Sequence, residues 1–248
     1  MRRALAILGL TAALLATASA GRAAPLVADL SSHLVAISTG FAGTEVLLFG
    51  AIEDRGDVVV VVRGPNTPVV MHRKSQIAGI WVNTATMTFE QAPSFYRVNA
   101  SAPLEEVATD PVRARHQMGV DNIDIELPPA KASPNIAEEW TAALVRAKQR
   151  ERLYPRGVGR VTFLGAQLFR TTVFFPANVP TGNYQVEVYL LRDGRVVSAQ
   201  TTPLIVSKVG IEAQLFRFAY EQAALYGLVA ILVALVAGWL AHSLFRKA

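Results

Sequence analysis

The stretch that decides the fold is Asp57-Val58-Val59-Val60-Val61-Val62-Arg63, in which five valines follow one another. Asp54-Arg55-Gly56 precedes it and Gly64-Pro65-Asn66 follows it, and both triplets are typical of turns. Valine branches at Cβ and favours extended backbone, and an unbroken apolar run leaves no face for water. The pattern therefore predicts a fully buried strand and a protein that is mainly β.

Shorter runs of similar character flank the valines at intervals of roughly 8 to 12 residues, which favours an antiparallel, Ig-like β-sandwich. In a first β region, residues 25–100, the predicted strands are Leu34–Ile37, Glu45–Ile52, Val69–His72, Ile80–Val82, Met87–Phe89 and Phe95–Val98. In a second, residues 156–210, they are Arg160–Phe163, Leu168–Phe175, Tyr184–Leu191 and Val196–Val206. Between the last two, Asp193-Gly194 predicts a type I′ hairpin turn. The pattern leaves open whether the body contains one sandwich or two.

Residues 101–155 carry helix signals instead. Asp110-Pro111 is typical of a helix start and Gly119 of a helix end. A longer helix is predicted to begin near Ser133-Pro134 and to end before Pro155, with acidic residues in its first turn and basic residues in its last. We expect this segment to be a helical insertion in one sandwich or a bridge between two.

Two apolar segments frame the body. Residues 1–20 resemble a secretory signal peptide, with cleavage after Ala20 or Ala24, and a retained N-terminal anchor is the alternative. Near the other end, the run from Ala223 to Ala241 carries no charge over 19 residues. At about 1.5 Å per residue this run matches a hydrocarbon core of about 30 Å. We expect a juxtamembrane segment at 211–222, a transmembrane helix at 223–244 and a tail at 245–248.

Charge placement predicts the orientation in the membrane. Arg246-Lys247 directly follow the apolar helix, so the positive-inside rule puts the tail in the cytoplasm and the body in the periplasm, at a bacterial inner membrane.

All nineteen acidic residues lie between Asp29 and Glu221, and nineteen of the twenty-four basic residues lie in the same span. A body without net charge is a poor ligand for nucleic acid, which leaves the lipid bilayer as the expected partner.

No residue set in the sequence predicts catalysis. The chain has no cysteine, and its four histidines (His33, His72, His116 and His242) lack the short spacings that place two metal ligands on one strand or helix face. Serine-nucleophile and nucleotide-binding motifs are missing as well. We therefore expect no enzyme activity, no metal and no cofactor.

Two groups of residues are candidates for binding. Basic, aromatic and amide side chains occur close together in the first β region, where they could hold a small anion or a partner loop: His72, Arg73, Lys74, Trp81, Asn83 and Tyr96. The alternative is that the aromatic residues belong to the core and that the basic residues form a solvated sheet edge. Small residues also recur along one side of the apolar helix and could pack against a second helix, with a histidine continuing the row: Gly227, Ala230, Ala234, Gly238 and His242.

Several short motifs together resemble a known family. They are Gly79–Asn83, Pro93–Tyr96, Pro103-Leu104, Gly182–Tyr184, Tyr189–Gly194, Tyr226-Gly227 and Gly238-Trp239. On these motifs the chain resembles the alphaproteobacterial putative transmembrane protein family, whose function is unassigned. The resemblance implies an inner-membrane protein with a periplasmic body and adds no catalytic residue. The family's association with exporters implies a transport accessory.

Two hypotheses of different kinds follow. The first is a non-enzymatic accessory protein that contacts another membrane or envelope component, either a multi-spanning protein such as a transporter or a second copy of the chain. The second is a periplasmic binding module for a small anion. The two differ in whether the basic and aromatic candidates line one concave pocket.

Overall fold

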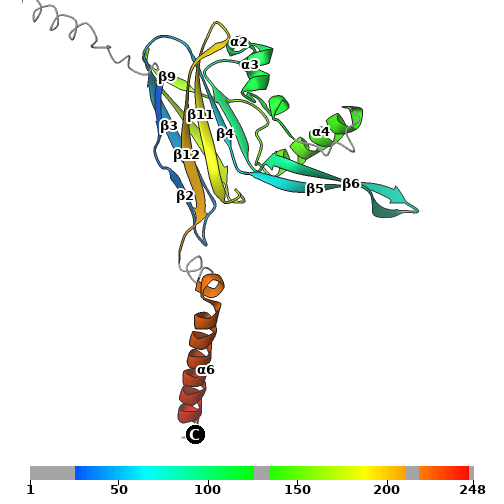
Figure 1. Cartoon of the computed structure of the whole chain (residues 1–248), viewed down its shortest axis with the longest axis vertical. Coiled ribbons are helices and arrows are strands. Elements are labelled where there is room, and N and C mark those ends of the chain that lie inside the picture. The colour runs from blue at the N-terminus through cyan, green and yellow to red at the C-terminus, as the bar shows by residue number, and fades with distance from the viewer. Residues whose placement is uncertain (1–25, 126–133, 211–217, 246–248) are drawn as a thin grey trace, which may run out of the picture.

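The computed structural model describes residues 26–125, 134–210 and 218–245 (Figure 1). The predicted signal peptide lies outside these ranges, as do residues 211–217 of the juxtamembrane segment and residues 246–248 of the tail.

Two β-sheets form the body. The four-stranded sheet has the order β1 (Leu26–Leu30), β3 (Gly43–Ile52), β10 (Leu168–Pro176) and β9 (Thr162–Leu164). The six-stranded sheet has the order β2 (Leu34–Ile37), β12 (Arg195–Lys208), β11 (Gly182–Arg192), β4 (Asp57–Arg63), β7 (Tyr96–Ala100) and β8 (Gly159–Arg160). All ladders are antiparallel except those of the two edge strands, β2 on β12 and β8 on β7. The mainly β sandwich predicted from the sequence is confirmed.

The two β regions build one sandwich between them. β10 from the second region pairs with β3 from the first, and β11 from the second pairs with β4 from the first. Neither of the two sheets of the sandwich is built from one region alone, so one sandwich is formed and the alternative of two does not apply.

A helical layer covers the outer face of the six-stranded sheet (Figure 1). Its elements are α2 (Leu104–Val107), α3 (Asp110–Arg115) and the short 3₁₀ turn η1 (Val120–Asn122). α3 begins at the predicted Asp110-Pro111, but it ends before Gly119, which has a φ of 103° in the following loop. The buried Leu104, Val107 and Met118 anchor this layer on the sheet.

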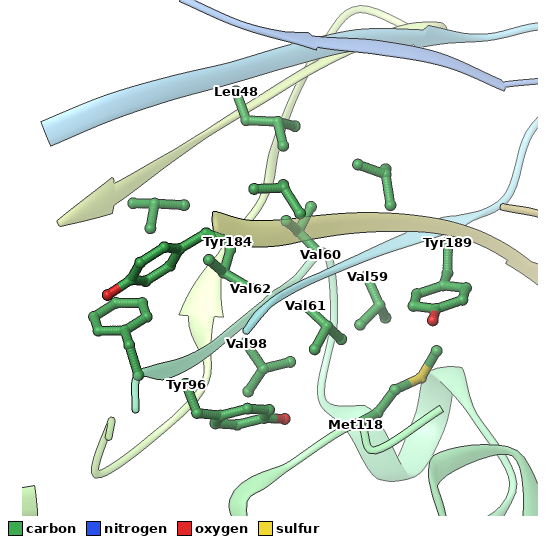
Figure 2. Packing of buried hydrophobic residues seen from close by; sticks show 14 of the residues in the cluster. Leu48, Val59, Val60, Val61, Val62, Tyr96, Val98, Met118, Tyr184 and Tyr189 are labelled. Carbon is green, nitrogen blue, oxygen red and sulfur yellow. The ribbon is translucent and has the colours of Figure 1, made fainter. Parts of the chain in front are cut away.

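β4 is therefore buried on both faces. Figure 2 shows Val60 and Val62 on the side of Leu48, in the four-stranded sheet, and Val59 and Val61 on the side of Met118 and the helices. All five valines are no more than 1% exposed. The run of valines has no polar alternation because neither face of the strand meets water.

The strand predictions fail where the chain leaves the sandwich. Val69–His72, Ile80–Val82 and Met87–Phe89 were expected as three short strands, but they belong to two long ones, β5 (Asn66–Ile77) and β6 (Ile80–Pro93). These two strands pair only with each other and form a separate two-stranded sheet. Most residues of this hairpin are exposed, and apolar and polar residues are mixed along it. The sequence therefore shows no pattern that would indicate how long the two strands are.

Two further differences lie at sheet edges. β1 had no predicted counterpart, and the single strand expected at Arg160–Phe163 is divided into β8 and β9, which lie in different sheets. The predicted turn at Asp193-Gly194 is confirmed, because the two residues have φ angles of 50° and 72° and join the paired Arg192 and Arg195.

α6 (Ala223–Phe245) stands apart from the body as a single rod (Figure 1). Its segment Ala223–His242 has a mean hydropathy of 2.3, and none of it is buried against the rest of the protein. It is the one helix among the described residues that is long and apolar enough to cross a membrane. The predicted C-terminal apolar helix is thus present with the expected start.

The two-sided burial of β4 can be tested with a pair of substitutions. Val60→Thr and Val61→Thr keep the side-chain shape but place a hydroxyl on opposite faces of the strand. We expect each to lower the free energy of unfolding by about 1–3 kcal/mol, because each hydroxyl is buried against apolar side chains. Urea unfolding followed by circular dichroism measures the effect. Val70→Thr, at a position that is 56% exposed, is the control and should change stability little; a neutral result for either core variant would contradict two-sided burial.

Candidate functional site

The hairpin formed by β5 and β6 is the most prominent feature of the surface (Figure 1). It continues the ladder of β4 and β7: the Gly64 N–H donates to the Phe95 carbonyl at 2.8 Å, and the Ser94 N–H donates to the Pro65 carbonyl at 2.9 Å. Twelve residues of β5 at about 3.3 Å each give an arm of roughly 40 Å. The arm is therefore rooted in the most deeply buried strand pair of the sandwich.

The proximal half of the hairpin is held by α4 (Pro134–Arg150), which lies beside it (Figure 1). Met87 and Phe89 of β6 are buried in the same hydrophobic core as Trp140 and Leu144 of α4. Arg73 adds a polar attachment, since its guanidinium lies 2.6 Å from the Glu139 carboxylate and 5.1 Å from the centre of the Trp140 ring. A cation over an indole ring is attractive in addition to the ion pair.

The distal half, from Lys74 to Asn83, is exposed at every residue except Ser75 and ends in an apolar tip. Ile77 pairs with Ile80 across a two-residue turn, Ala78-Gly79, in which both residues have a positive φ. Ile80 is 67% exposed and Trp81 is 65% exposed, and Ile77 is exposed to a similar degree. Large apolar side chains gathered at an exposed tip are typical of a surface that another molecule covers.

The structure does not bring the six predicted binding residues into one pocket. Five lie on the hairpin and one, Tyr96, lies in the core. Lys74 and Asn83 are register partners on the distal half, and Trp81 pairs with Gln76 near the tip. His72 and Arg73 lie nearer the body and already have partners: the His72 Nδ1 is 3.0 Å from the Thr86 hydroxyl, and Arg73 is held by α4.

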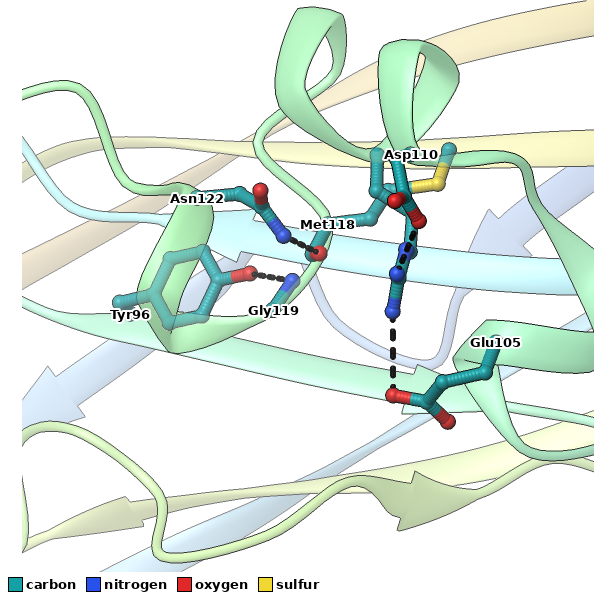
Figure 3. Close-up of polar contacts among 7 residues, drawn as sticks. Tyr96, Glu105, Asp110, Met118, Gly119 and Asn122 are labelled. Atoms are coloured by element: carbon teal, nitrogen blue, oxygen red, sulfur yellow. Dashed lines mark hydrogen bonds and ion pairs between the residues drawn. The ribbon is translucent and has the colours of Figure 1, made fainter.

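Tyr96 is a structural residue. Its hydroxyl donates to the Gln117 carbonyl at 2.7 Å and accepts from the Gly119 N–H at 2.8 Å, which ties β7 to the loop after α3 (Figure 3). Burial raises the pKa of the Tyr96 phenol above its ordinary value, so the group stays protonated and can donate. Because its one hydroxyl hydrogen is already donated to the Gln117 carbonyl, Tyr96 has no donor to offer to an external anion.

The neighbouring loop and helices are fixed by further polar contacts. Arg113 of α3 lies 3.0 Å from the Glu105 carboxylate and also pairs with Asp110, and the Asn122 amide donates to the Met118 carbonyl at 2.8 Å (Figure 3). These contacts join α2 to α3 and fix the loop that Tyr96 holds over β7.

The exposed apolar side chains of the hairpin suit recognition by another molecule. Within the described part of the chain, no group of three or more His, Asp or Glu side chains is placed to hold a metal ion. A polar cleft of about 420 Å³ lies at the hairpin base, but its one arginine, Arg63, is already paired with Glu187. The exposed apolar tip thus remains the most distinctive surface of the arm.

Of the large apolar residues at the tip, sequence reasoning named Trp81 but missed Ile77 and Ile80. Ile77 and Ile80 flank Ala78-Gly79, and a glycine-containing pair between two apolar residues is a usable signal for a hairpin tip. Glu139 is one of the acidic residues expected in the first turn of the longer helix, but α4 begins at Pro134 and its first turn contains no acidic residue. Nothing in the sequence indicates that Glu139 would meet Arg73. That contact depends on tertiary packing between segments 66 residues apart.

The fold and the exposed helix define the class: a β-sandwich protein with a single C-terminal helix able to cross a membrane. The family comparison agrees with this class. The chain belongs to the family described as "Putative transmembrane protein (Alph_Pro_TM)", whose profile matches residues 25–247. The resemblance drawn from the sequence motifs is thereby confirmed. A search of curated proteins finds no match to the chain.

The attachment of the hairpin to α4 predicts a local effect. Arg73→Ala removes both the ion pair and the cation–π contact, and we expect a loss of about 1 kcal/mol in stability, because both partners are partly exposed. Hydrogen exchange should become faster in β5 and β6 while β4 stays protected. Lys74→Ala, one residue further out, is the control and should leave exchange unchanged. Equal exchange in the two variants would show that Arg73 does not fasten the arm.

Proposed function

We propose that this protein is a non-enzymatic accessory protein, anchored in the bacterial inner membrane, that docks on a multi-spanning membrane protein such as a transporter. A signal peptide at residues 1–20 exports the body to the periplasm, and the tail after the apolar helix stays in the cytoplasm. The observation that carries the proposal is the hairpin arm, which is rigidly rooted at one end and ends in exposed isoleucine and tryptophan side chains.

The construction of the hairpin supports docking. Its root is an extension of the buried ladder of β4 and β7, so the arm loses little conformational freedom when a partner covers its tip. Tryptophan is enriched among residues that dominate binding energy, because it brings a large rigid area with an apolar body. Trp81 lies next to Ile80 at the end of the arm, where a partner can reach it from several sides.

The apolar helix supports a partner that is itself a membrane protein. Beyond the adjacent backbone of α6 itself, no atom of the described residues lies within 4 Å of the position that a Cβ would occupy on Gly227 or Gly238, so no described residue fills the small-residue side of α6 at these two positions. Ala230 and Ala234 continue that side, and small residues at this spacing let a second helix approach closely. Contacts through both the helix and the hairpin strengthen each other, because the first contact raises the effective concentration for the second.

The anion-binding module proposed on His72, Arg73, Lys74, Trp81, Asn83 and Tyr96 has weaker support. Arg73 is occupied by Glu139 and Trp140, Tyr96 by backbone groups, and the others are spread along an exposed hairpin. A hairpin without a concavity offers few converging donors to a small anion.

Site-specific photocrosslinking in living cells tests the docking surface. A benzophenone amino acid at position 81 should form a covalent adduct with a membrane protein of different mass, since the hairpin tip is proposed to lie in the interface. The same probe at Val27, which is exposed on β1 of the sandwich, is the matched control and should form none. Adducts only between copies of the chain would replace the accessory proposal by a homodimer, and no adduct at either position would refute docking through the tip.

The contribution of the apolar helix is tested separately. Replacing Ala234 and Gly238 together by Ile should reduce recovery of the partner in detergent pull-downs several-fold, because the larger side chains keep the helices apart. Val236→Ile, which adds bulk elsewhere on the helix, should leave recovery unchanged. Unchanged recovery with the double variant would limit the interface to the hairpin.

A further inference from the structure

A second surface of the body has a different character. A cleft of about 600 Å³ opens beside β7, between the C-terminal end of α4, the segment that follows it, and β10. Four guanidinium groups line it, from Arg97, Arg150, Arg152 and Arg156. None of its lining residues belongs to the hairpin of β5 and β6.

The charges in this cleft are unbalanced. No aspartate or glutamate is among its lining residues, and none of the four arginines forms an ion pair with any residue that the structure describes. Other arginines of the body, such as Arg113 and Arg192, do have carboxylate partners. The C-terminal end of α4 contributes a partial negative charge of roughly one half, which is much smaller than the four positive charges of the arginines. The cleft is therefore electropositive.

Arg97 is the most deeply placed of the four. It lies beside Val62 in the ladder between β4 and β7, and its Nε is buried without a hydrogen-bond partner among the described residues. Burial lowers the pKa of the Arg97 guanidinium from its ordinary value, and Glu45 opposes this effect. A buried donor without an acceptor is costly, and an anion in the cleft would supply the acceptor.

Arg152 occupies a position that ordinarily belongs to glycine. The Leu153 N–H donates to the Lys148 carbonyl at 2.9 Å and the Arg152 N–H donates to the Gln149 carbonyl at 3.1 Å, the two bonds of a Schellman motif. In this motif the residue just after the helix cap needs a left-handed backbone. Arg152 is that residue, and its φ is 61°. Glycine adopts this conformation without strain. The helix end would thus fold more easily without this arginine, whose side chain lines the cleft.

The geometry points to a binding site, in this cleft, for a small organic oxyanion that carries a phosphate-type group. Arginine presents a planar fork of donors that fits the oxygens of such a group, and several arginines together suit an anion with several acceptor oxygens. A volume of about 600 Å³ lies within the range of small-molecule sites and exceeds what one oxyanion group fills. Phe174, which is 38% exposed, also lines the cleft and offers apolar surface to the organic part.

Two sources share this chemistry, a soluble phosphate ester and the headgroup of a phospholipid. The test uses the full-length protein in phosphatidylcholine nanodiscs and titration calorimetry with two probes, glycerol phosphate and dihexanoyl phosphatidylglycerol. Saturable binding is expected. If glycerol phosphate binds at least as tightly, the ligand is a soluble ester; if the lipid binds tenfold more tightly, the site takes a headgroup.

Arg152→Gly separates binding from folding. We expect it to weaken binding of the preferred probe about tenfold or more while the melting temperature stays the same or rises, because glycine relieves the left-handed backbone. Arg150→Gln should weaken binding as well. The control, Arg195→Gln, removes one positive charge from the exposed turn between β11 and β12 and should change affinity less than twofold. The proposal is overturned if neither probe binds, or if Arg152→Gly and Arg195→Gln bind both probes equally well.

Discussion

The rest of the structure depends on the burial of one strand, β4, from both sides. The four-stranded sheet covers Val60 and Val62, and the helical layer covers Val59 and Val61, so five consecutive valines are removed from water. Each fully buried valine contributes about 1.5–3 kcal/mol relative to an exposed one. The chain contains no cysteine and therefore no disulfide, so apolar packing of this kind has to hold the sandwich together. β7 and β11 both pair with β4, which joins the two β regions in the six-stranded sheet as β3 does in the four-stranded sheet.

The same constraint explains how a long hairpin can project from the body. β5 and β6 continue the ladder of β4 and β7 past a bend at Gly64-Pro65, where a side chain on Gly64 would meet the Ser94 hydroxyl at 2.5 Å. α4 then supports the first half of the arm through Trp140 and Arg73. A two-stranded sheet alone in water is marginally stable, so this support decides where the firm part of the arm ends. The exposed tip is held at a distance from the sandwich by packing at the root.

Much of the fold could be predicted from the sequence, and the limits have physical causes. Three features were predictable because each is contained in one short continuous stretch of sequence. They are the buried valine run, the Asp193-Gly194 turn with its positive φ angles, and the apolar helix that is long enough to cross a membrane. The full length of β5 and β6 could not be predicted, because a hairpin in solvent needs no alternation of apolar and polar residues. Five of the six predicted binding residues lie on one hairpin, and among them only Trp81 lies at its tip. Tyr96 was included although its partners are backbone groups of a distant loop. Arg150 and Arg152 were attributed to the helix dipole alone, because only the tertiary fold brings Arg97 to the same cleft.

The central claim is that the sandwich and its arm lie outside the cytoplasm and are held to the membrane by α6. The absence of cysteine allows a direct measurement with single introduced thiols, Asn83→Cys on the exposed distal half of the hairpin and Ala248→Cys in the tail. Spheroplasts are treated with a maleimide that does not cross membranes. The account predicts that the thiol at position 83 is labelled in intact spheroplasts and that the thiol at position 248 is labelled only after lysis. Protection of position 83 until lysis would contradict it.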